Sequence, residues 1–217
     1  MANRQRGFTL IEILVVVSIL AVLMGLVVVL VGKAPEQERI MRTQTAVSKL
    51  KLAIDSYQGE FQRLPPMTVK ELAGSAAAYK GLTSDVDNVN ECIETLVAAL
   101  RHPDLSTPLG DDVEFGNTDE DSFNMVLPNT NSAEAMEIVD AWGNPIVYIH
   151  KNAYGTPVRI RLATGDEVEI EAVKKPDGTY YNQSTYQLIS LGKNGKQDLH
   201  ETPDLSDDIV NFKLRSQ

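Results

Sequence analysis

The chain has 217 residues, a formal net charge of −10 and a single cysteine. An acidic protein has no long-range attraction for nucleic acid, so this charge argues against direct binding to DNA or RNA. One cysteine, Cys92, excludes an intramolecular disulfide bond even in an oxidising compartment, and its apolar surroundings predict a buried thiol.

The N-terminal segment combines a short basic leader with a long apolar run. The leader carries two arginines, and the run extends from Phe8 to Val31 with Glu12 as its one ionisable side chain. At 1.5 Å per residue, about 24 helical residues span about 36 Å, which exceeds the ~30 Å hydrocarbon core of a bilayer. We therefore predict a transmembrane helix over residues 8–33, with the leader on the cytoplasmic side according to the positive-inside rule.

Glu12 distinguishes this run from a simple anchor. A carboxylate within a membrane helix costs ~3 kcal/mol even on the scale derived from insertion experiments, so it needs a partner. A cut after Gly7 would create an amine on Phe8, one helical turn before Glu12, and pairing within or between subunits would compensate both charges. A cleaved secretory signal has a shorter apolar region, and a plain signal anchor leaves Glu12 without a role. Self-association of the helix is therefore the favoured hypothesis.

The segment from Gly7 to Glu12, which reads GFTLIE, resembles the class III leader of type IV pilins and pseudopilins. The resemblance implies that residues 1–7 are a leader peptide, that a prepilin peptidase cuts after Gly7, and that Phe8 becomes N-methylated. It also implies that Glu12 is the carboxylate used in filament assembly.

An amphipathic continuation of the helix, with the turn that ends it, is predicted over residues 34–66. Pro35 permits a bend, and Pro65-Pro66 ends the region because proline cannot continue a helix. One long helix from Phe8 to near Tyr57 is therefore expected. Its apolar residues recur at three- and four-residue spacing, the pattern of a helix that lays one face on a core: Ile40, Ala46, Val47, Leu50, Ala53, Ile54 and Tyr57.

Residues 67–139 form a middle region with fewer signals. A helix is predicted from Asn90 to Leu100, and a loop rich in Asp, Gly, Asn and Pro follows from His102 to Asn131. The acidic residues of this loop have no metal-ligand spacing, so a solvated flexible loop is preferred to a metal site. These residues are Asp111, Asp112, Glu114, Asp119, Glu120 and Asp121.

Residues 140–217 have the pattern of a small antiparallel sheet, with tight-turn signals between short strands. Trp142 is predicted to anchor the contact between helix and sheet. The predicted strands are Ile146–His150, Val158–Leu162, Val168–Glu171 and Tyr186–Ser190. The predicted fold class is therefore α+β, a long N-terminal transmembrane and amphipathic helix packed on a small C-terminal antiparallel β-sheet.

Three regions are similar to the major, or G-type, pseudopilins of type II secretion systems: the helix end at 52–66, the DAWGNP element at 140–145, and the tail, which matches over the two segments 190–196 and 204–212. The tail loop of that family binds calcium, a hard cation that prefers oxygen ligands. Carried over to this chain, the resemblance implies a main-chain carbonyl ligand from Leu191, a side-chain oxygen from Asn194, and a carboxylate from Asp207 or Asp208.

The implied role is structural, and no enzymatic activity is expected. The three histidines are scattered, with no nucleophile or metal ligand at a recognised spacing. The resemblance implies a single-pass inner-membrane protein, with a cytoplasmic N-terminus and a periplasmic C-terminal domain, that polymerises into a periplasmic pseudopilus to drive protein export. The implied partners are its own copies, minor pseudopilins, the prepilin peptidase, an inner-membrane assembly platform and a secretion ATPase.

Two alternative functions stay open. A type IV pilin for adhesion, motility or DNA uptake shares the N-terminal motif, although many such pilins carry a C-terminal disulfide loop that a single cysteine excludes. A signal-anchored periplasmic calcium-binding protein that never polymerises shares the anchor and the tail, but has no use for Glu12.

Overall fold

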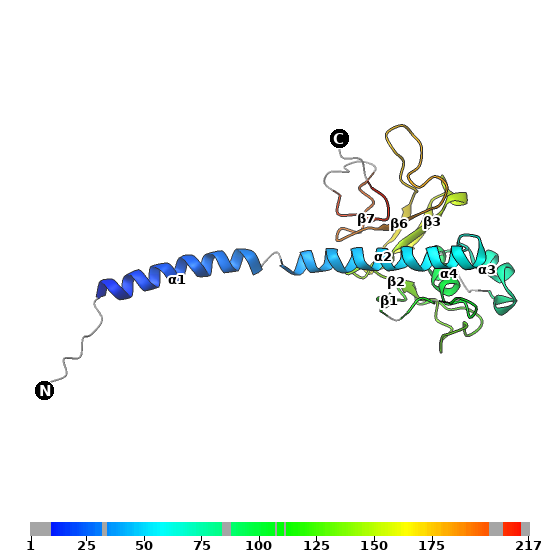
Figure 1. Ribbon diagram of the computed structural model, residues 1–217, viewed down its shortest axis with the longest axis horizontal. Coiled ribbons are helices and arrows are strands. Elements are labelled where there is room, and N and C mark those ends of the chain that lie inside the picture. The colour runs from blue at the N-terminus through cyan, green and yellow to red at the C-terminus, as the bar shows by residue number, and fades with distance from the viewer. Residues whose placement is uncertain are drawn as a thin grey trace. The chain divides into compact units, whose positions relative to one another are not determined.

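The computed structural model describes residues 10–31, 34–83, 88–106, 108–110, 112–199 and 206–213, with the elements labelled in Figure 1. The chain divides into two units between Arg39 and Ile40, and each is described by itself. The leader, Gly7 and Phe8 lie outside the described residues.

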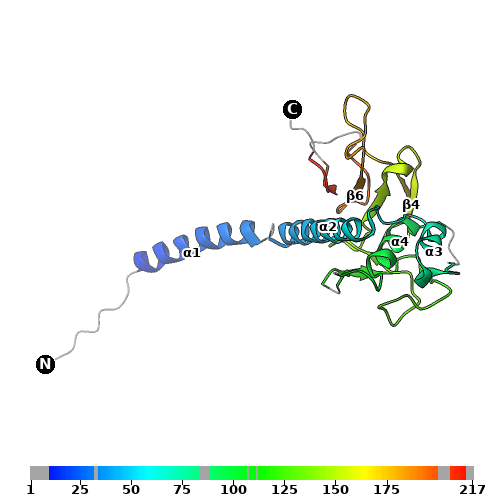
Figure 2. The same ribbon diagram turned by 45° about the vertical axis from the view of Figure 1, so that its right-hand side comes forward.

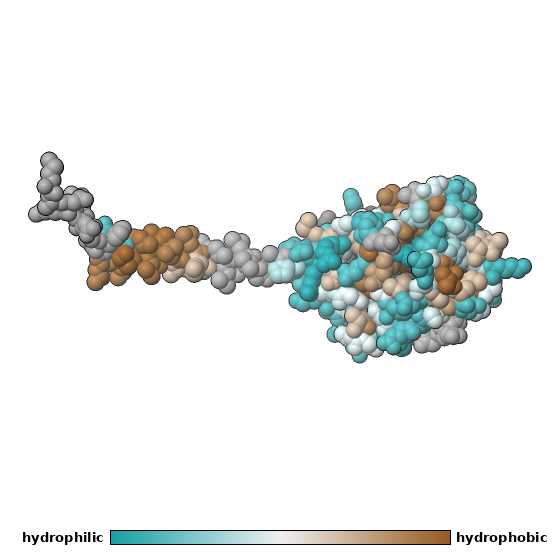
Figure 3. Space-filling model, turned by 90° about the horizontal axis from the view of Figure 1, so that it is seen from below, coloured by the Kyte–Doolittle hydropathy of each residue, from teal (hydrophilic) through white to brown (hydrophobic). Residues whose placement is uncertain are grey.

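The first unit contains α1, Leu10–Val31, a regular helix in both views of the ribbon (Figures 1 and 2). Its side chains from Leu10 to Met24 are exposed and form a mainly hydrophobic surface (Figure 3). Whereas the sequence predicts a transmembrane helix, no helix among the described residues is long and apolar enough to cross a membrane. The second long helix, α2, is Ala34–Phe61, so the predicted continuity from Phe8 to Tyr57 depends on residues 32–33, which lie outside the described chain.

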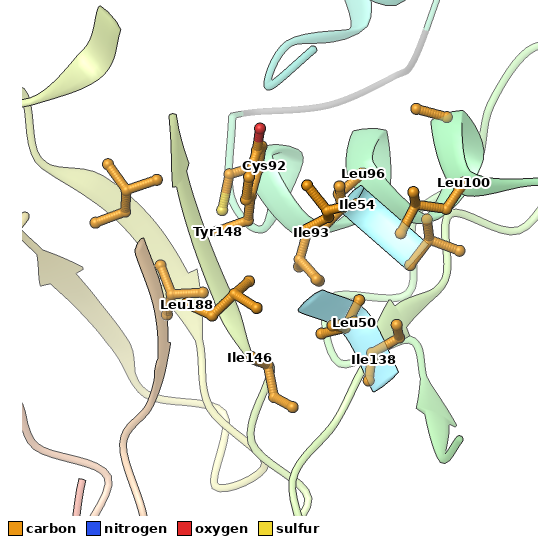
Figure 4. Close-up of a cluster of buried hydrophobic side chains, with 14 of the residues drawn as sticks. Leu50, Ile54, Cys92, Ile93, Leu96, Leu100, Ile138, Ile146, Tyr148 and Leu188 are labelled. Carbon is orange, nitrogen blue, oxygen red and sulfur yellow. The ribbon is translucent and has the colours of Figure 1, made fainter. Parts of the chain in front are cut away.

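In the second unit, α2 lays one face on the core, as its periodicity predicts. The buried apolar residues of this face are Val47, Leu50, Ile54 and Tyr57. Figure 4 shows Leu50 and Ile54 pointing into a cluster of buried side chains. The cluster includes Ile93, from the helix Glu91–Leu100, together with Ile138 and Ile146. The predicted members Ile40, Ala46 and Ala53 are only partly buried and line the margin of this face.

The middle region is a folded layer. It contains α3, Val69–Ser75, the 3₁₀ turn η1, Ala77–Tyr79, and α4, Glu91–Leu100, which coincides with the helix predicted at 90–100. Every residue of α4 from Cys92 to Leu100 is buried, and the Tyr79 hydroxyl donates a hydrogen bond to the Ala98 carbonyl at 2.7 Å. α4 is therefore the central helix of this layer.

The acidic loop of the middle region is not simply solvated. Its strand β1, Phe115–Gly116, pairs antiparallel with β2, Glu137–Ile138. The carboxylate oxygens of Asp119 and Asp121 are buried. The prediction of a flexible, solvated loop is wrong for this part, because pairing with β2 turns these two side chains toward α4.

The C-terminal residues form two small antiparallel sheets where one was predicted. One sheet has the order β3-β6-β7 and the other is the hairpin β4-β5. The strands are β3, Val147–His150, β4, Val158–Arg161, β5, Glu167–Ile170, β6, Tyr186–Ser190, and β7, Ile209–Val210, and a second 3₁₀ turn, η2, spans Lys151–Ala153. All four predicted strands are present within one or two residues. The fold is thus α+β, with a long helix packed on small antiparallel sheets.

Asp140 holds the turn that leads into β3. Its Oδ1 accepts hydrogen bonds from the amides of Trp142, at 2.9 Å, and Asn144, at 3.0 Å, while its Oδ2 accepts one from the Ser190 hydroxyl at 2.7 Å. Burial raises the pKa of Asp140, and these hydrogen bonds oppose that shift. Trp142 is only partly buried, so its predicted role as the core anchor is wrong and the buried carboxylate fixes the turn instead.

The thiol of Cys92 is buried at the start of α4, as predicted, with 4% of the residue exposed. Burial raises its pKa to about 12, because the thiolate would be poorly solvated there. The chain therefore has no accessible native thiol.

Candidate functional site

The carboxylate predicted to act in assembly lies at the start of α1. Glu12 is exposed and falls in the first turn of this helix, where the positive end of the helix dipole favours a negative charge. A shallow groove runs along the same helix, lined by Leu10, Ile13, Leu14, Val17, Ser18 and Ala21. At 100° per residue, Glu12 projects from the side opposite this groove. The helix therefore carries a single carboxylate on the side opposite an apolar groove that contains small residues.

Of the predicted calcium ligands, Asp207 and Asp208 hydrogen-bond to the loop segment that carries Asn194, and Leu191 is buried at the start of that segment. We define the tail loop as residues 191–199 with residues 206–208. The Oδ2 atom of Asp207 accepts hydrogen bonds from the amides of Lys193, at 2.7 Å, and Asn194, at 3.1 Å. The Oδ2 atom of Asp208 accepts hydrogen bonds from the amides of Asp198, at 2.9 Å, and Leu199, at 3.2 Å. Both carboxylates therefore tie the two segments of the tail loop together.

Each of these carboxylates also has an oxygen that the described residues do not satisfy. The Oδ1 atoms of Asp207 and Asp208 are buried, and neither has a hydrogen-bond partner within the described part of the chain. Burial raises the pKa of Asp208 to about 6, with the Ser206 hydroxyl and loop amides acting in the opposite direction. Two buried carboxylate oxygens without donors fit a hard cation.

Asn194 fits the predicted ligand set less well. Its Oδ1 accepts a hydrogen bond from the Lys196 amide at 2.7 Å, and its Nδ2 donates one to Asp198 at 2.5 Å. Asp198 is thus a further acidic group of the tail loop that the sequence comparison missed, because it lies between the two segments that resemble the family loop.

Gly192 allows the two segments of the tail loop to approach closely. Its φ is +60°, and a Cβ at this position would lie 2.5 Å from the main-chain oxygen of Asp207. The Gly192 carbonyl accepts a hydrogen bond from Asn144 at 3.1 Å. The tail loop is therefore fixed to the same turn that Asp140 holds.

Residues 2–28 match the prokaryotic N-terminal methylation motif, which is found in type IV pilins and pseudopilins. The match covers the basic leader, Gly7, Phe8 and Glu12, so it supports the predicted type IV pilin-like character of the N-terminal segment. No curated protein and no solved structure matches the chain. The finer similarity to G-type pseudopilins stays a prediction.

Proposed function

We propose that this chain is a structural subunit of a periplasmic pseudopilus of a type II secretion system. The observation that carries the proposal is the methylation motif over residues 2–28, which joins the basic leader, Gly7-Phe8 and Glu12 to an apolar helix. A prepilin peptidase would remove the leader, the N-terminal segment would anchor the chain in the inner membrane, and the second unit would face the periplasm. An assembly platform, a secretion ATPase and minor pseudopilins would build the homopolymer.

The apolar surface of α1 supports assembly through this helix. Its described side chains are exposed and apolar except for Glu12 and Ser18, so in the filament they would pack against copies of the same helix. Small residues such as Ser18 and Ala21 in the groove permit close helix approach. Glu12, on the opposite side, would pair with the methylated amine of Phe8, within its own subunit or in a neighbour.

The tail loop favours a pseudopilus over a type IV pilus for adhesion, motility or DNA uptake. Its two buried, unsatisfied carboxylate oxygens are the feature expected of the calcium loop in G-type pseudopilins. In this proposal Asp207 and Asp208 supply carboxylate oxygens, the Leu191 carbonyl and Asn194 supply the others, and the bound Ca²⁺ neutralises the loop. The net charge of −10 also disfavours a surface that holds DNA.

Processing at Gly7 is the direct test of the proposed function. Intact-mass and N-terminal peptide analysis of the protein extracted from membranes should find a chain that begins at Phe8 and carries one methyl group on its amine. A Gly7→Leu variant should retain the leader, because the peptidase needs the small residue before the cut. A mature N-terminus beyond Val31 would contradict the proposal, since the chain would then have lost Glu12 and the whole of α1.

Removal of calcium should destabilise the tail loop. With a ligand that binds only the folded state, a hundredfold excess over Kd contributes about 2.7 kcal/mol, several degrees in melting temperature for a chain of this size. Melting curves of the full chain in detergent, with calcium or with a chelator, measure this shift. The double variant Asp207→Asn/Asp208→Asn should show a smaller calcium-dependent shift, whereas Glu169→Gln on the exposed face of β5 should not change it. A calcium-dependent melting shift of undiminished size in the double variant would contradict calcium binding in the tail loop.

A further inference from the structure

Four acidic side chains of the middle region meet inside the second unit. They are Glu94 from α4, Asp119 and Asp121 from the loop after β1, and Glu137 from β2. Glu94, Asp119 and Glu137 each place a carboxylate oxygen within 4.8 Å of the other two. Asp121 lies within hydrogen-bonding reach of Glu94. We call these four residues the inner acidic cluster.

The position of Glu137 in this cluster is fixed by several donors. Its Oε1 accepts hydrogen bonds from the Asn90 amide side chain, at 2.6 Å, and from the Thr118 hydroxyl, at 3.0 Å, and the Thr118 backbone amide donates to the same carboxylate. Asn90 is held in turn by the backbone amide of Arg161 at the end of β4, which donates to its Oδ1 at 2.9 Å. The cluster is therefore built on four elements of the fold and does not depend on one mobile loop.

The loop after β1 is folded so that its acids face inward. The antiparallel pairing of Gly116 with Glu137 starts the loop beside the cluster. The side chain of Asn117 bridges to the backbone of Asp121 in both directions, at 3.0 and 3.2 Å. The carboxylate oxygens of Asp119 and Asp121 are buried, while Glu120 between them is exposed.

The buried carboxyl group of Glu94 indicates that the cluster binds a ligand. The residue is 0% exposed, and neither of its carboxylate oxygens accepts a hydrogen bond from a donor within the described part of the chain. Burial raises its pKa to about 11, and the charges of Asp121, Asp119 and Glu137 act in the same direction. A carboxyl group buried among other carboxylates must be neutralised, because isolated charge in the protein interior costs several kcal/mol. A bound proton neutralises one carboxylate, whereas a bound cation contacts all of them.

We propose that the inner acidic cluster is a binding site for a divalent cation, with Glu94, Asp119, Asp121 and Glu137 as its ligands. All of these ligand atoms are carboxylate oxygens, which select hard cations over zinc or copper. Oxygens at about 2.3–2.6 Å from one Ca²⁺ lie at most about 5 Å apart, which the spacing of the Glu94, Asp119 and Glu137 oxygens satisfies. Ca²⁺ suits this site better than Mg²⁺, because it accepts six to eight oxygens in adaptable geometry and gives up its water more readily.

The ion would act as a cross-link within the second unit. Its ligands come from α4, from the loop after β1 and from β2, so binding would fix the acidic loop against the central helix of the middle layer. This site is distinct from the tail loop, with which it shares no residue, and it does not depend on the proposed filament function.

Calcium binding to the full chain tests the inference once the tail loop can no longer bind an ion. We expect the Asp207→Asn/Asp208→Asn protein, stripped with a chelator and studied in detergent, to bind one Ca²⁺ per chain in equilibrium dialysis. Adding Glu94→Gln to this background should weaken that binding at least tenfold, and adding Asp121→Asn should do the same. Glu120→Gln, which removes the exposed acid between two proposed ligands, should leave the affinity unchanged.

Folding of the variants is checked in the chelator, where no ion contributes. Glu94→Gln preserves the shape of the side chain and removes the buried charge, so its melting temperature in chelator should equal or exceed that of the parent. A folded Asp207→Asn/Asp208→Asn protein that binds no calcium overturns the inference, as does a folded Glu94→Gln or Asp121→Asn variant of it that binds as tightly as its parent. Neither result affects the tail-loop proposal, because that proposal is tested by comparing the calcium-dependent melting shift of the wild-type chain with that of the double variant.

Discussion

Replacing Glu12 with leucine is expected to abolish filament formation while leaving the chain in the membrane. The substitution removes a cost of ~3 kcal/mol for a carboxylate in the apolar segment, so insertion should become easier. Assembly should fail, because the amine of Phe8 then has no carboxylate to pair with and leaving such a charge alone at low dielectric is costly. Membrane fractionation and the yield of sheared or purified filaments, scored separately, measure the two effects.

Two control variants isolate the role of the charge at this position. Glu12→Gln keeps the length and the hydrogen-bonding capacity of the side chain, so a loss of filaments in this variant assigns the effect to the ion pair. Ile11→Leu, a volume-conserving change one residue away and outside the residues that line the groove, should assemble normally. If Glu12→Leu produces filaments at the wild-type yield, the assembly role of Glu12 is wrong, although the methylation motif would still describe processing.

Replacing Asp140 with alanine should be among the most destabilising single changes in the second unit. The variant leaves the amides of Trp142 and Asn144 and the hydroxyl of Ser190 without their acceptor. Buried donors that lose a partner cost about 1–3 kcal/mol each, so we expect a total of about 3 kcal/mol or more. A chain of this size loses roughly 2–4 °C in melting temperature per kcal/mol, which makes the expected shift on the order of 10 °C.

Ser190→Ala provides the matched comparison for this turn. It removes the bond to Oδ2 of Asp140 and also the acceptor of the Gly192 amide, which donates to the Ser190 hydroxyl at 3.2 Å, and should cost about 1–2 kcal/mol. Asp140→Asn should fall between the two variants, because its remaining oxygen can still accept the turn amides. An Asp140→Ala protein that melts within about 2 °C of the wild type would show that another group holds the turn.

The helix and the strands could be predicted because their signals are local. The spacing of Val47, Leu50, Ile54 and Tyr57 determines which face of α2 is buried, and that face is set by residues within three turns of one helix. The strands lie between turn signals, so their bounds were found within one or two residues. The division into two sheets was not predicted, since local pattern does not say which strands pair.

The inner acidic cluster shows where prediction from the sequence failed. Asp119 and Asp121 stand in a stretch rich in Asp, Gly and Asn, whose composition indicates a solvated loop. They meet Glu94 and Glu137, which lie in α4 and β2 and have no regular sequence spacing from the loop. In the tail loop, by contrast, Asp207 and Asp208 are adjacent in the sequence and the family resemblance could identify them, but Asp198 required the fold.

The burial of Cys92 makes this chain convenient for mapping contacts between subunits by chemical labelling. A thiol with a pKa of about 12 and 4% exposure has almost no reactive thiolate near neutral pH, so maleimide reagents would spare it in the folded protein. A cysteine introduced at Met41 or Leu52, which are 66% and 71% exposed on α2, would then be the single reactive position. Distances and cross-links between neighbouring copies could be measured on the native background, because Cys92 would not need to be replaced first.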